Sequence, residues 1–297
     1  MIFVAKNLKA NGVNLLMNDY AAGLPSPLSF IGLADVLARE LGVIGLMNIQ
    51  FAIKGEDVYL LEVNPRASRT VPFVSKAIAR PLAKVAALCM AGIDLERQGM
   101  TEPVVPHYYA VKEAVFPFAK FLGVDVLLGP ELRSTGEVMG IGQSFGEAYA
   151  KAQVGAGNPL PAGGTAFLSL RDADKTPVLE EVARQLLRFG FELVGTAGTV
   201  DYLAARGVEC RVVNKVQDGR PHIVDMITNG AIHFVVNTTE GRQAIADSFA
   251  IRHAALRYKV PYTTTLAGAR ATCLALQAER SVSVNCLHDL HRELSSA

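Results

Sequence analysis

Short apolar runs alternate with segments of helical periodicity throughout the second half of the chain. The apolar runs predict strands at residues 166–170, 191–196, 209–215, 232–238 and 260–265. The periodic segments predict helices at residues 176–190, 199–207, 222–230 and 241–259. Strand and helix alternating about every twenty residues is typical of parallel βαβ units. The pattern therefore predicts an α/β fold with a doubly wound parallel sheet.

The first half has a less regular pattern, which predicts an α+β arrangement. Residues 1–31 lack a clear period. The later segments predict a helix at 33–41, a hairpin of strands 46–53 and 58–63, helical structure at 74–91, a strand at 108–118 and a helix at 144–153. The clearest linker is GAGNPLPAGG, residues 155–164, because its prolines and glycines cannot sustain a helix or an interior strand. We therefore expect two domains, 1–154 and 165–297.

Composition narrows the class of protein. Of the 297 residues, 50% are hydrophobic and 19% are charged, so a sizeable core can form. The net charge of +1 gives no electrostatic case for binding nucleic acid or an anionic membrane. No apolar run approaches the roughly 18 residues of a membrane span. Four widely separated cysteines indicate reduced thiols rather than a disulfide framework, and the expected location is cytoplasmic.

The predicted hairpin carries oxygen-bearing side chains on one face. With a three-residue loop at residues 55–57, Gln50 faces Glu62, and Asn64 lies on the same side of the strand. Hard oxygen ligands are those that Mg²⁺ takes, usually together with phosphate oxygens. Arg66 follows and offers a forked donor to phosphate. The alternative is an ordinary hairpin with one polar face.

The string GLMNIQFAIKGEDVYLLEVNPRASRTVPFVSKA, residues 45–77, resembles the closing strands of the second ATP-grasp domain of carbamoyl-phosphate synthase large subunits. The resemblance implies that Gln50, Glu62 and Asn64 hold the Mg²⁺ or Mn²⁺ ions that bridge ATP phosphates, and that Arg66 contacts phosphate in catalysis. The glycine-rich phosphate loop and adenine-binding lysine of such a domain are not recognisable before residue 33. We therefore expect the chain by itself to be inactive as an ATP-using enzyme.

Polar residues follow four of the predicted parallel strands, where ligands bind in doubly wound folds. They are Ser169, Lys175, Thr196, Gly198, Thr199, Lys215, Asn237, Thr238 and Thr239. A helix start with hydroxyls and lysines is suited to one phosphate monoester. Residues 165–280 also resemble the methylglyoxal-synthase-like domain of the same family, which implies UMP or IMP as the effector. Taken singly, each Thr or Asn is better explained as a helix cap or a turn former, and their convergence at four successive strand ends outweighs that alternative.

A further resemblance covers residues 111–142. It assigns Glu113 and Leu128 to a site for ornithine, completed by Tyr262, Thr263 and Thr264. The family has an aspartate at the position of Thr263, so a cationic amino acid would lose a carboxylate partner here. The alternative for this segment is packing between domains.

The resemblance implies a glutamine-hydrolysing ligase that makes carbamoyl phosphate for arginine and pyrimidine synthesis from bicarbonate, glutamine-derived ammonia and two ATP. The implied partners are a small glutamine amidotransferase subunit and the rest of the large subunit, and homo-oligomerisation is left open. One alternative is a non-catalytic nucleotide-binding module. Another is a methylglyoxal-synthase-type lyase, for which Asp218 or Asp225 would be the base, although the family's Gly–Gly–Asp motif is absent. For Arg220 and His222, pocket lining and helix capping are equally expected.

Overall fold

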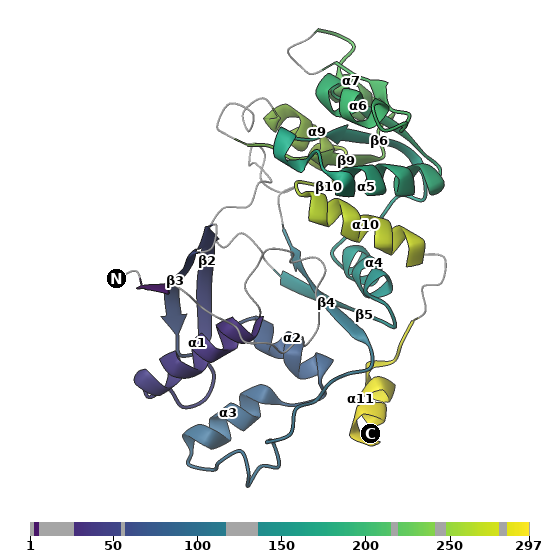
Figure 1. The fold of residues 1–297 in the computed structure, drawn as a ribbon. Helices are drawn as coiled ribbons and strands as arrows, with labels where there is room; N and C mark the ends of the chain where they lie inside the picture. The colour runs from purple at the N-terminus through teal and green to yellow at the C-terminus, as the bar shows by residue number, and fades with distance from the viewer. Residues whose placement is uncertain are drawn as a thin grey trace. The chain divides into compact units, whose positions relative to one another are not determined.

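The computed structural model describes residues 3–5, 27–54, 57–116, 136–214, 219–240, 248–278 and 284–296. The chain divides into two compact units (Figure 1). Unit 1 contains residues 1–106 together with 286–297, and unit 2 contains residues 107–285. The predicted linker at 155–164 lies within unit 2, and the domain boundary placed there stays a prediction. Each unit is described separately below.

A five-stranded parallel sheet forms the centre of unit 2 and confirms the predicted fold class. Its strands, in spatial order, are β10 (Tyr262–Thr263), β9 (Phe234–Asn237), β6 (Gly164–Ser169), β7 (Phe191–Gly195) and β8 (Arg211–Val212). All neighbours pair in parallel. The outer strands β8 and β10 have two residues each, so the sequence overestimated the length of both edges of the sheet.

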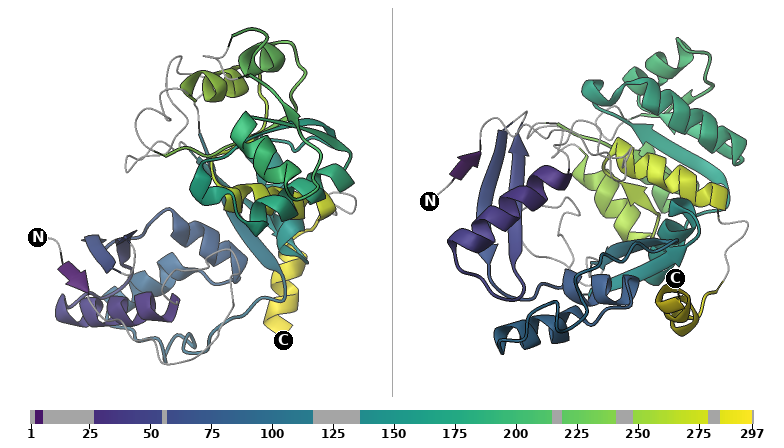
Figure 2. Two further views of the ribbon diagram at one scale, coloured as in Figure 1. Left: turned by 45° about the horizontal axis from the view of Figure 1, so that its top comes forward. Right: turned by 60° about the horizontal axis from the view of Figure 1, so that its bottom comes forward.

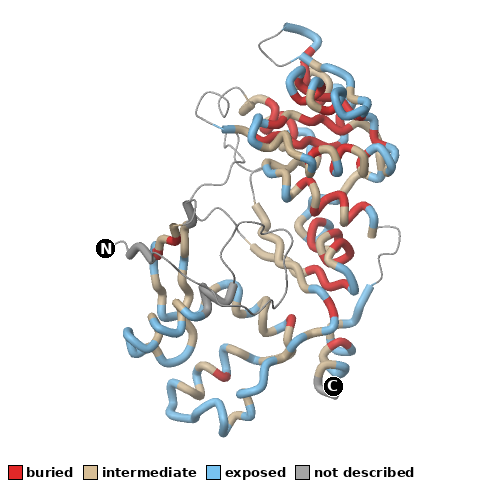
Figure 3. Tube along the Cα trace, viewed as in Figure 1, coloured by how far each residue is buried: buried red, intermediate tan, exposed pale blue. Residues whose placement is uncertain are grey.

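Helices cover both faces of this sheet, and buried residues are concentrated between the layers (Figures 1 and 3). On one face lie α5 (Pro177–Arg188), α6 (Ala197–Ala204) and α10 (Leu266–Ala278), and on the other lie α7 (Ile223–Thr228) and α9 (Phe249–Arg257). In β6, Leu168 packs with the first set and Phe167 with the second. Because both faces are covered, the strands are continuous apolar runs rather than alternating ones.

The sequence signals of α5 explain its limits. Thr176 has extended backbone at the N-cap position and Pro177 follows at the first helical position. The Thr176 side chain makes no capping hydrogen bond. Gly190 has a φ of +85° just past the helix end, where a residue with a Cβ would be strained.

The remaining part of unit 2 is a two-stranded ribbon covered by a helix. The strand β4 (Tyr109–Val115) pairs antiparallel with β5 (Gly136–Gly142), and α4 (Phe145–Gly155) packs on the ribbon and on α10 (Figure 2). The sequence did not predict β5, because its glycines resemble turn signals. They permit close packing instead: a Cβ on Gly140 would come within 2.0 Å of the Ala148 carbonyl oxygen in α4.

Unit 1 has a three-stranded antiparallel sheet and four helices among the described residues. The strands are β1 (Phe3–Ala5), β3 (Asp57–Asn64) and β2 (Asn48–Lys54), in that spatial order. The helices are α1 (Pro27–Glu40), α2 (Thr70–Ala77), α3 (Leu82–Met90) and α11 (Leu287–Ser296). No element was predicted within residues 1–31, where the structure has β1 and the start of α1.

The helical structure predicted for 74–91 consists of two helices, α2 and α3. Ala79 has a φ of +53° and Pro81 precedes α3, so the chain changes direction between the two helices. All four cysteines are free thiols. Within the described ranges, no helix combines the length and the apolar character that crossing a bilayer requires.

Candidate functional site

The hairpin of β2 and β3 brings Gln50 directly opposite Glu62, as predicted. The loop is shorter than expected, because Lys54 pairs with Asp57 and only two residues separate them. That register alone would place Gln50 opposite Leu61. A β-bulge intervenes: Phe51 pairs with Leu60, Gln50 pairs with Glu62, and Leu61 is the extra residue. The bulge therefore restores the pairing that the two-residue loop would have broken.

The polar face of this hairpin is already organised. The Asn64 side-chain amide donates a 2.8 Å hydrogen bond to Glu62 Oε1. Arg66 lies just beyond the strand and donates from Nη1 to the Ala67 carbonyl oxygen at 3.2 Å, a weak local contact on an exposed side chain. The face thus offers one carboxylate and two side-chain amide oxygens. This donor set fits a hard divalent cation that takes oxygen ligands.

The carboxyl ends of β6 and β9 lie side by side in unit 2. Ser169 pairs with Asn237 across the two strands, and the Thr238 amide donates to the Ser169 carbonyl oxygen at 3.0 Å. Asn237 is 2% exposed, and its Oδ1 has no hydrogen-bond partner among the described residues. A buried acceptor without a donor costs free energy. Among the described residues nothing donates to this oxygen, and a ligand with a hydroxyl or amide group can do so.

Two of the predicted threonines fix the loop after β6. The Thr199 hydroxyl accepts from the Leu170 amide at 3.1 Å, and the Thr238 hydroxyl accepts from the Arg171 amide at the same distance. Thr196 Oγ1 lies 3.3 Å from Thr199 Oγ1. These hydroxyls shape the loop that carries Lys175, as the turn-forming alternative expects.

Lys175 and the first turn of α6 converge. A Cβ built on Gly198 would come within 3.0 Å of Lys175 Nζ. The ammonium group therefore lies beside the first turn of α6, the end of a helix where unpaired amides and the helix dipole favour an anion. Lys175 Nζ also donates to Asp172 Oδ1 at 2.6 Å. Asp172 did not figure among the expected site residues, although its spacing of three from Lys175 is a signal for such a pair.

The structure shows fewer contacts for the remaining residues near the strand ends and in the middle segment. Lys215 lies outside the described residues, as does Leu128. Thr239 is half-buried after β9. Asn214 forms an isolated bridge with His222, and its carbonyl oxygen accepts from the Ile223 amide at 3.1 Å.

His222 caps α7. Its Nδ1 accepts from the Asp225 amide at 3.3 Å, and Asp225 Oδ2 accepts from the His222 amide at 3.1 Å. Arg220 Nη2 lies 3.5 Å from the same carboxylate. Helix capping is therefore the alternative that holds for His222, and Asp225, one of the two lyase-base candidates, serves the same cap. Asp218 lies outside the described residues.

Glu113 lies beside an aromatic neighbour that the sequence did not single out, Tyr149 in α4. Burial raises the pKa of Glu113. Burial also raises the pKa of Tyr149, and the negative charge of Glu113 adds to this, whereas a hydrogen bond with Thr272 opposes it. The Thr263 hydroxyl donates to the Thr265 carbonyl oxygen at 3.2 Å. That hydroxyl is thus engaged in the turn before α10, and the half-buried Tyr262 and Thr264 flank it in sequence.

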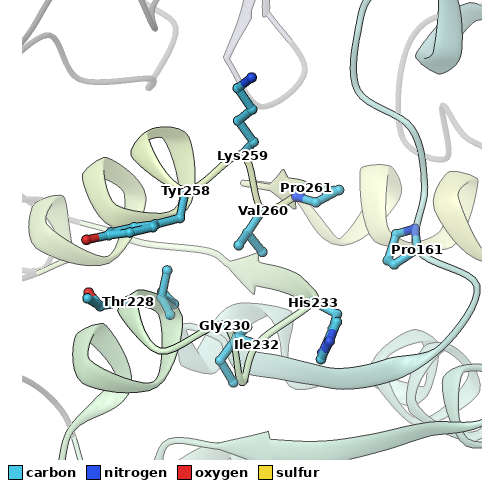
Figure 4. A pocket seen from close by; sticks show the side chains of 10 residues that line it. Pro161, Thr228, Gly230, Ile232, His233, Tyr258, Lys259, Val260 and Pro261 are labelled. Carbon is cyan, nitrogen blue, oxygen red and sulfur yellow. The ribbon is translucent and has the colours of Figure 1, made fainter.

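A cavity of about 330 Å³ opens at the opposite edge of the sheet, near the amino ends of β9 and β10 (Figure 4). Tyr258 and Thr228 face each other across it, while the Lys259 side chain extends away from both. Its other lining residues are mainly apolar, among them Ile227, Ile232 and Val260. The predicted phosphate-site residues are at the carboxyl edge and take no part in this cavity.

Comparisons with known proteins find a family match in each of the two units. Residues 33–98 match the family described as carbamoyl-phosphate synthase L chain, ATP binding domain, and residues 178–264 match the MGS-like domain family. The chain is similar to the carbamoyl phosphate synthase large chain of Pseudomonas syringae pv. tomato, with 58% identity over 260 residues. It is also similar to the large chain of Vibrio cholerae, with 55% identity over 262 residues. Each match covers 88% of this chain and 24% of the relative, so the chain spans about a quarter of their length.

Proposed function

Because this chain belongs to the family of carbamoyl phosphate synthase large chains, we propose that it contributes two parts of an ATP-dependent ligase of that kind. One part is the metal-binding end of an ATP-grasp site, and the other is a domain that binds a regulatory nucleotide. The proposed reaction makes carbamoyl phosphate from bicarbonate, glutamine-derived ammonia and two ATP. The 58% identity to relatives named for this activity supports the proposal.

The regulatory site is proposed at the carboxyl edge of the parallel sheet, with a nucleoside monophosphate such as UMP or IMP as its ligand. The observation that carries it is the position of Lys175 Nζ over Gly198 in the first turn of α6. A phosphate monoester there would receive a lysine donor and helix amides together. A ribose hydroxyl is a suitable donor for the buried Asn237 Oδ1. We place Ser169, Lys215 and Thr239 in the same site on the family resemblance.

The hairpin is proposed to hold the divalent cations of the ATP site through Gln50, Glu62 and Asn64. When bound, Mg²⁺ or Mn²⁺ would neutralise phosphate charge. Glu62 supplies the single anionic oxygen donor of the three, and its bond from Asn64 fixes the orientation of that carboxylate. Arg66 is proposed to contact phosphate by its guanidinium.

We propose as partners a small glutamine amidotransferase subunit and the further parts of a large subunit. Both are inferred from relatives about four times as long as the matched segment. A cytoplasmic location, and an amino-acid effector site at Glu113, Leu128, Tyr262 and Thr264, remain proposals of the same kind. The 297-residue chain by itself is proposed to lack ATP turnover.

Two measurements on the purified chain test these proposals. Calorimetric titration with UMP and with IMP should detect binding of at least one nucleotide, and Lys175→Ala should weaken that binding. Absence of binding by both would contradict the regulatory site. Bicarbonate-dependent ATP hydrolysis and ATP formation from carbamoyl phosphate and ADP should both be undetectable. Phosphoryl transfer by the chain would show that its ATP site is complete.

A further inference from the structure

The loop after β6 contains two acidic residues with different surroundings. Asp174 Oδ2 and Oδ1 accept from Arg171 Nε and Nη2 at 2.8 and 3.3 Å, and the Asp174 side chain is 18% exposed. Among the described residues, the Asp172 carboxylate accepts only from Lys175, at 2.6 Å, and the Asp172 side chain is 95% exposed. Asp174 therefore stabilises the loop through its two hydrogen bonds from Arg171. Asp172 extends into solvent and accepts a hydrogen bond from Lys175.

That lysine is the same group that the proposed phosphate site requires. Its side chain is 17% exposed, so it is largely enclosed while its partner is in water. Its Nζ lies over Gly198 at the start of α6. The Asp172 carboxylate is therefore an anion that already accepts a hydrogen bond from the Lys175 ammonium, the group that lies at the start of α6.

We propose that Asp172 is an internal competitor for Lys175, which an incoming phosphate monoester must displace, and that this residue sets the affinity of the site. The inference rests on the phosphate site proposed above. An exposed carboxylate loses little when it returns to water, since exposed ion pairs contribute little to stability. Its charge nevertheless repels a phosphate dianion at short range and holds the lysine in a competing geometry.

Two further observations agree with this role. The hydrogen bond from Lys175 and the charge of Lys175 lower the pKa of Asp172, so the carboxylate is anionic at neutral pH. The loop itself does not depend on Asp172, because Arg171, Asp174 and the hydroxyl of Thr238 fix it. A substitution at Asp172 is therefore expected to change binding without unfolding the loop.

The test compares UMP affinity, measured by calorimetry, for the wild-type chain, Asp172→Asn and the matched control Glu192→Gln. Glu192 is exposed and is the second residue of β7, near the amino end of the strand. The control therefore removes one negative charge at a position distant from the proposed site. Asp172→Asn should bind UMP roughly two- to fivefold more tightly, the scale of an exposed ion pair. Glu192→Gln should bind as the wild type does, because salt screens its distant charge.

The outcomes separate the two proposals. If the wild type binds UMP and Asp172→Asn binds no more tightly, the competitor role is wrong and the phosphate site stands. If neither chain binds UMP or IMP, the phosphate site is wrong and the competitor role is wrong with it. A second readout follows the Asp172 carboxyl by ¹³C NMR: its pKa should rise when UMP is saturating, since Lys175 leaves it and a phosphate arrives. An unchanged pKa would contradict displacement.

Discussion

Lys175 lies directly over Gly198, so that a Cβ on the glycine would come within 3.0 Å of the lysine Nζ. Lys175 lies in the connection that follows β6, and Gly198 lies in the first turn of α6, directly after the connection that follows β7. Parallel pairing of β6 with β7 brings these connections to the same edge of the sheet. The lysine charge and the helix amides therefore act on the same small volume, which is the basis of the proposed anion site.

Gly198→Ala tests this convergence. The added methyl group should displace Lys175 Nζ and obstruct approach to the first turn of α6, so UMP affinity should fall. Thermal stability should be unchanged or slightly higher, because the clash involves the end of a flexible side chain and alanine favours helix. Calorimetry and a thermal melt measure the two effects. Equal UMP affinity in the variant would mean that the ligand does not approach α6 beside Lys175.

Glu62→Gln tests the metal hairpin. Removing the carboxylate of the hairpin's polar face should weaken Mn²⁺ binding by about tenfold, which corresponds to roughly 1.4 kcal/mol. The loss of free Mn²⁺ signal in electron paramagnetic resonance measures this affinity. Asp57→Asn is the matched control, since Asp57 lies on the same strand beside the loop and pairs with Lys54. An equal effect of both substitutions would point to general charge rather than to a site.

Gly146→Ala tests the packing of α4 on α10. A Cβ at this position would come within 2.3 Å of the Leu274 carbonyl oxygen, which belongs to a helix backbone and cannot rotate away. Unfolding in urea should show a loss of about 1–3 kcal/mol. Gly163→Ala is the control, because its nearest contact would be an ordinary 3.5 Å. A similar stability for both variants would contradict the tight helix contact.

Glu113→Gln tests the cost of the buried carboxylate in unit 2. Burial raises the pKa of Glu113 in the folded chain above its ordinary value of 4.5. The folded state then holds a proton that the unfolded state releases, so the contribution of Glu113 to stability is present below pH 4.5 and is lost as pH rises through the raised value. The variant should gain stability relative to the wild type as pH rises from 4 to 7, measured by urea unfolding. A difference that does not change with pH would place Glu113 in a solvated position.

The parallel sheet was predictable because its strands are buried on both faces and its helices carry clear end signals. Phe167 and Leu168 are adjacent in sequence and belong to opposite core clusters, which explains the unbroken apolar runs. The strand β5 was not predictable from local pattern. Gly140 and Gly142 indicate a turn when read locally, and only the approach of α4 to the ribbon explains them.

The hairpin shows how a correct strand pairing can be predicted from an incorrect loop length. Gln50 was expected opposite Glu62 because of a three-residue loop, and the loop has two residues. The bulge at Leu61 supplies the missing shift. Bulges depend on pairing with the partner strand, and a single sequence gives no direct signal for them.

Part of the geometry of the proposed phosphate site was predictable, and part depended on contacts within the loop. Parallel topology alone places Ser169 and Asn237 at one edge. Sequence could not reveal that the hydroxyls of Thr199 and Thr238 accept hydrogen bonds from backbone amides, since those amides belong to another loop. Nor did it identify Asp172, whose importance depends on where Lys175 points.

Binding of UMP and of uridine to the same chain, compared by calorimetry with IMP and inosine as a second pair, tests the central claim most directly. At least one nucleotide should bind, its nucleoside should bind far more weakly, and Lys175→Ala should remove most of the difference. A nucleoside that binds as well as its nucleotide would contradict recognition of a phosphate at this edge of the sheet.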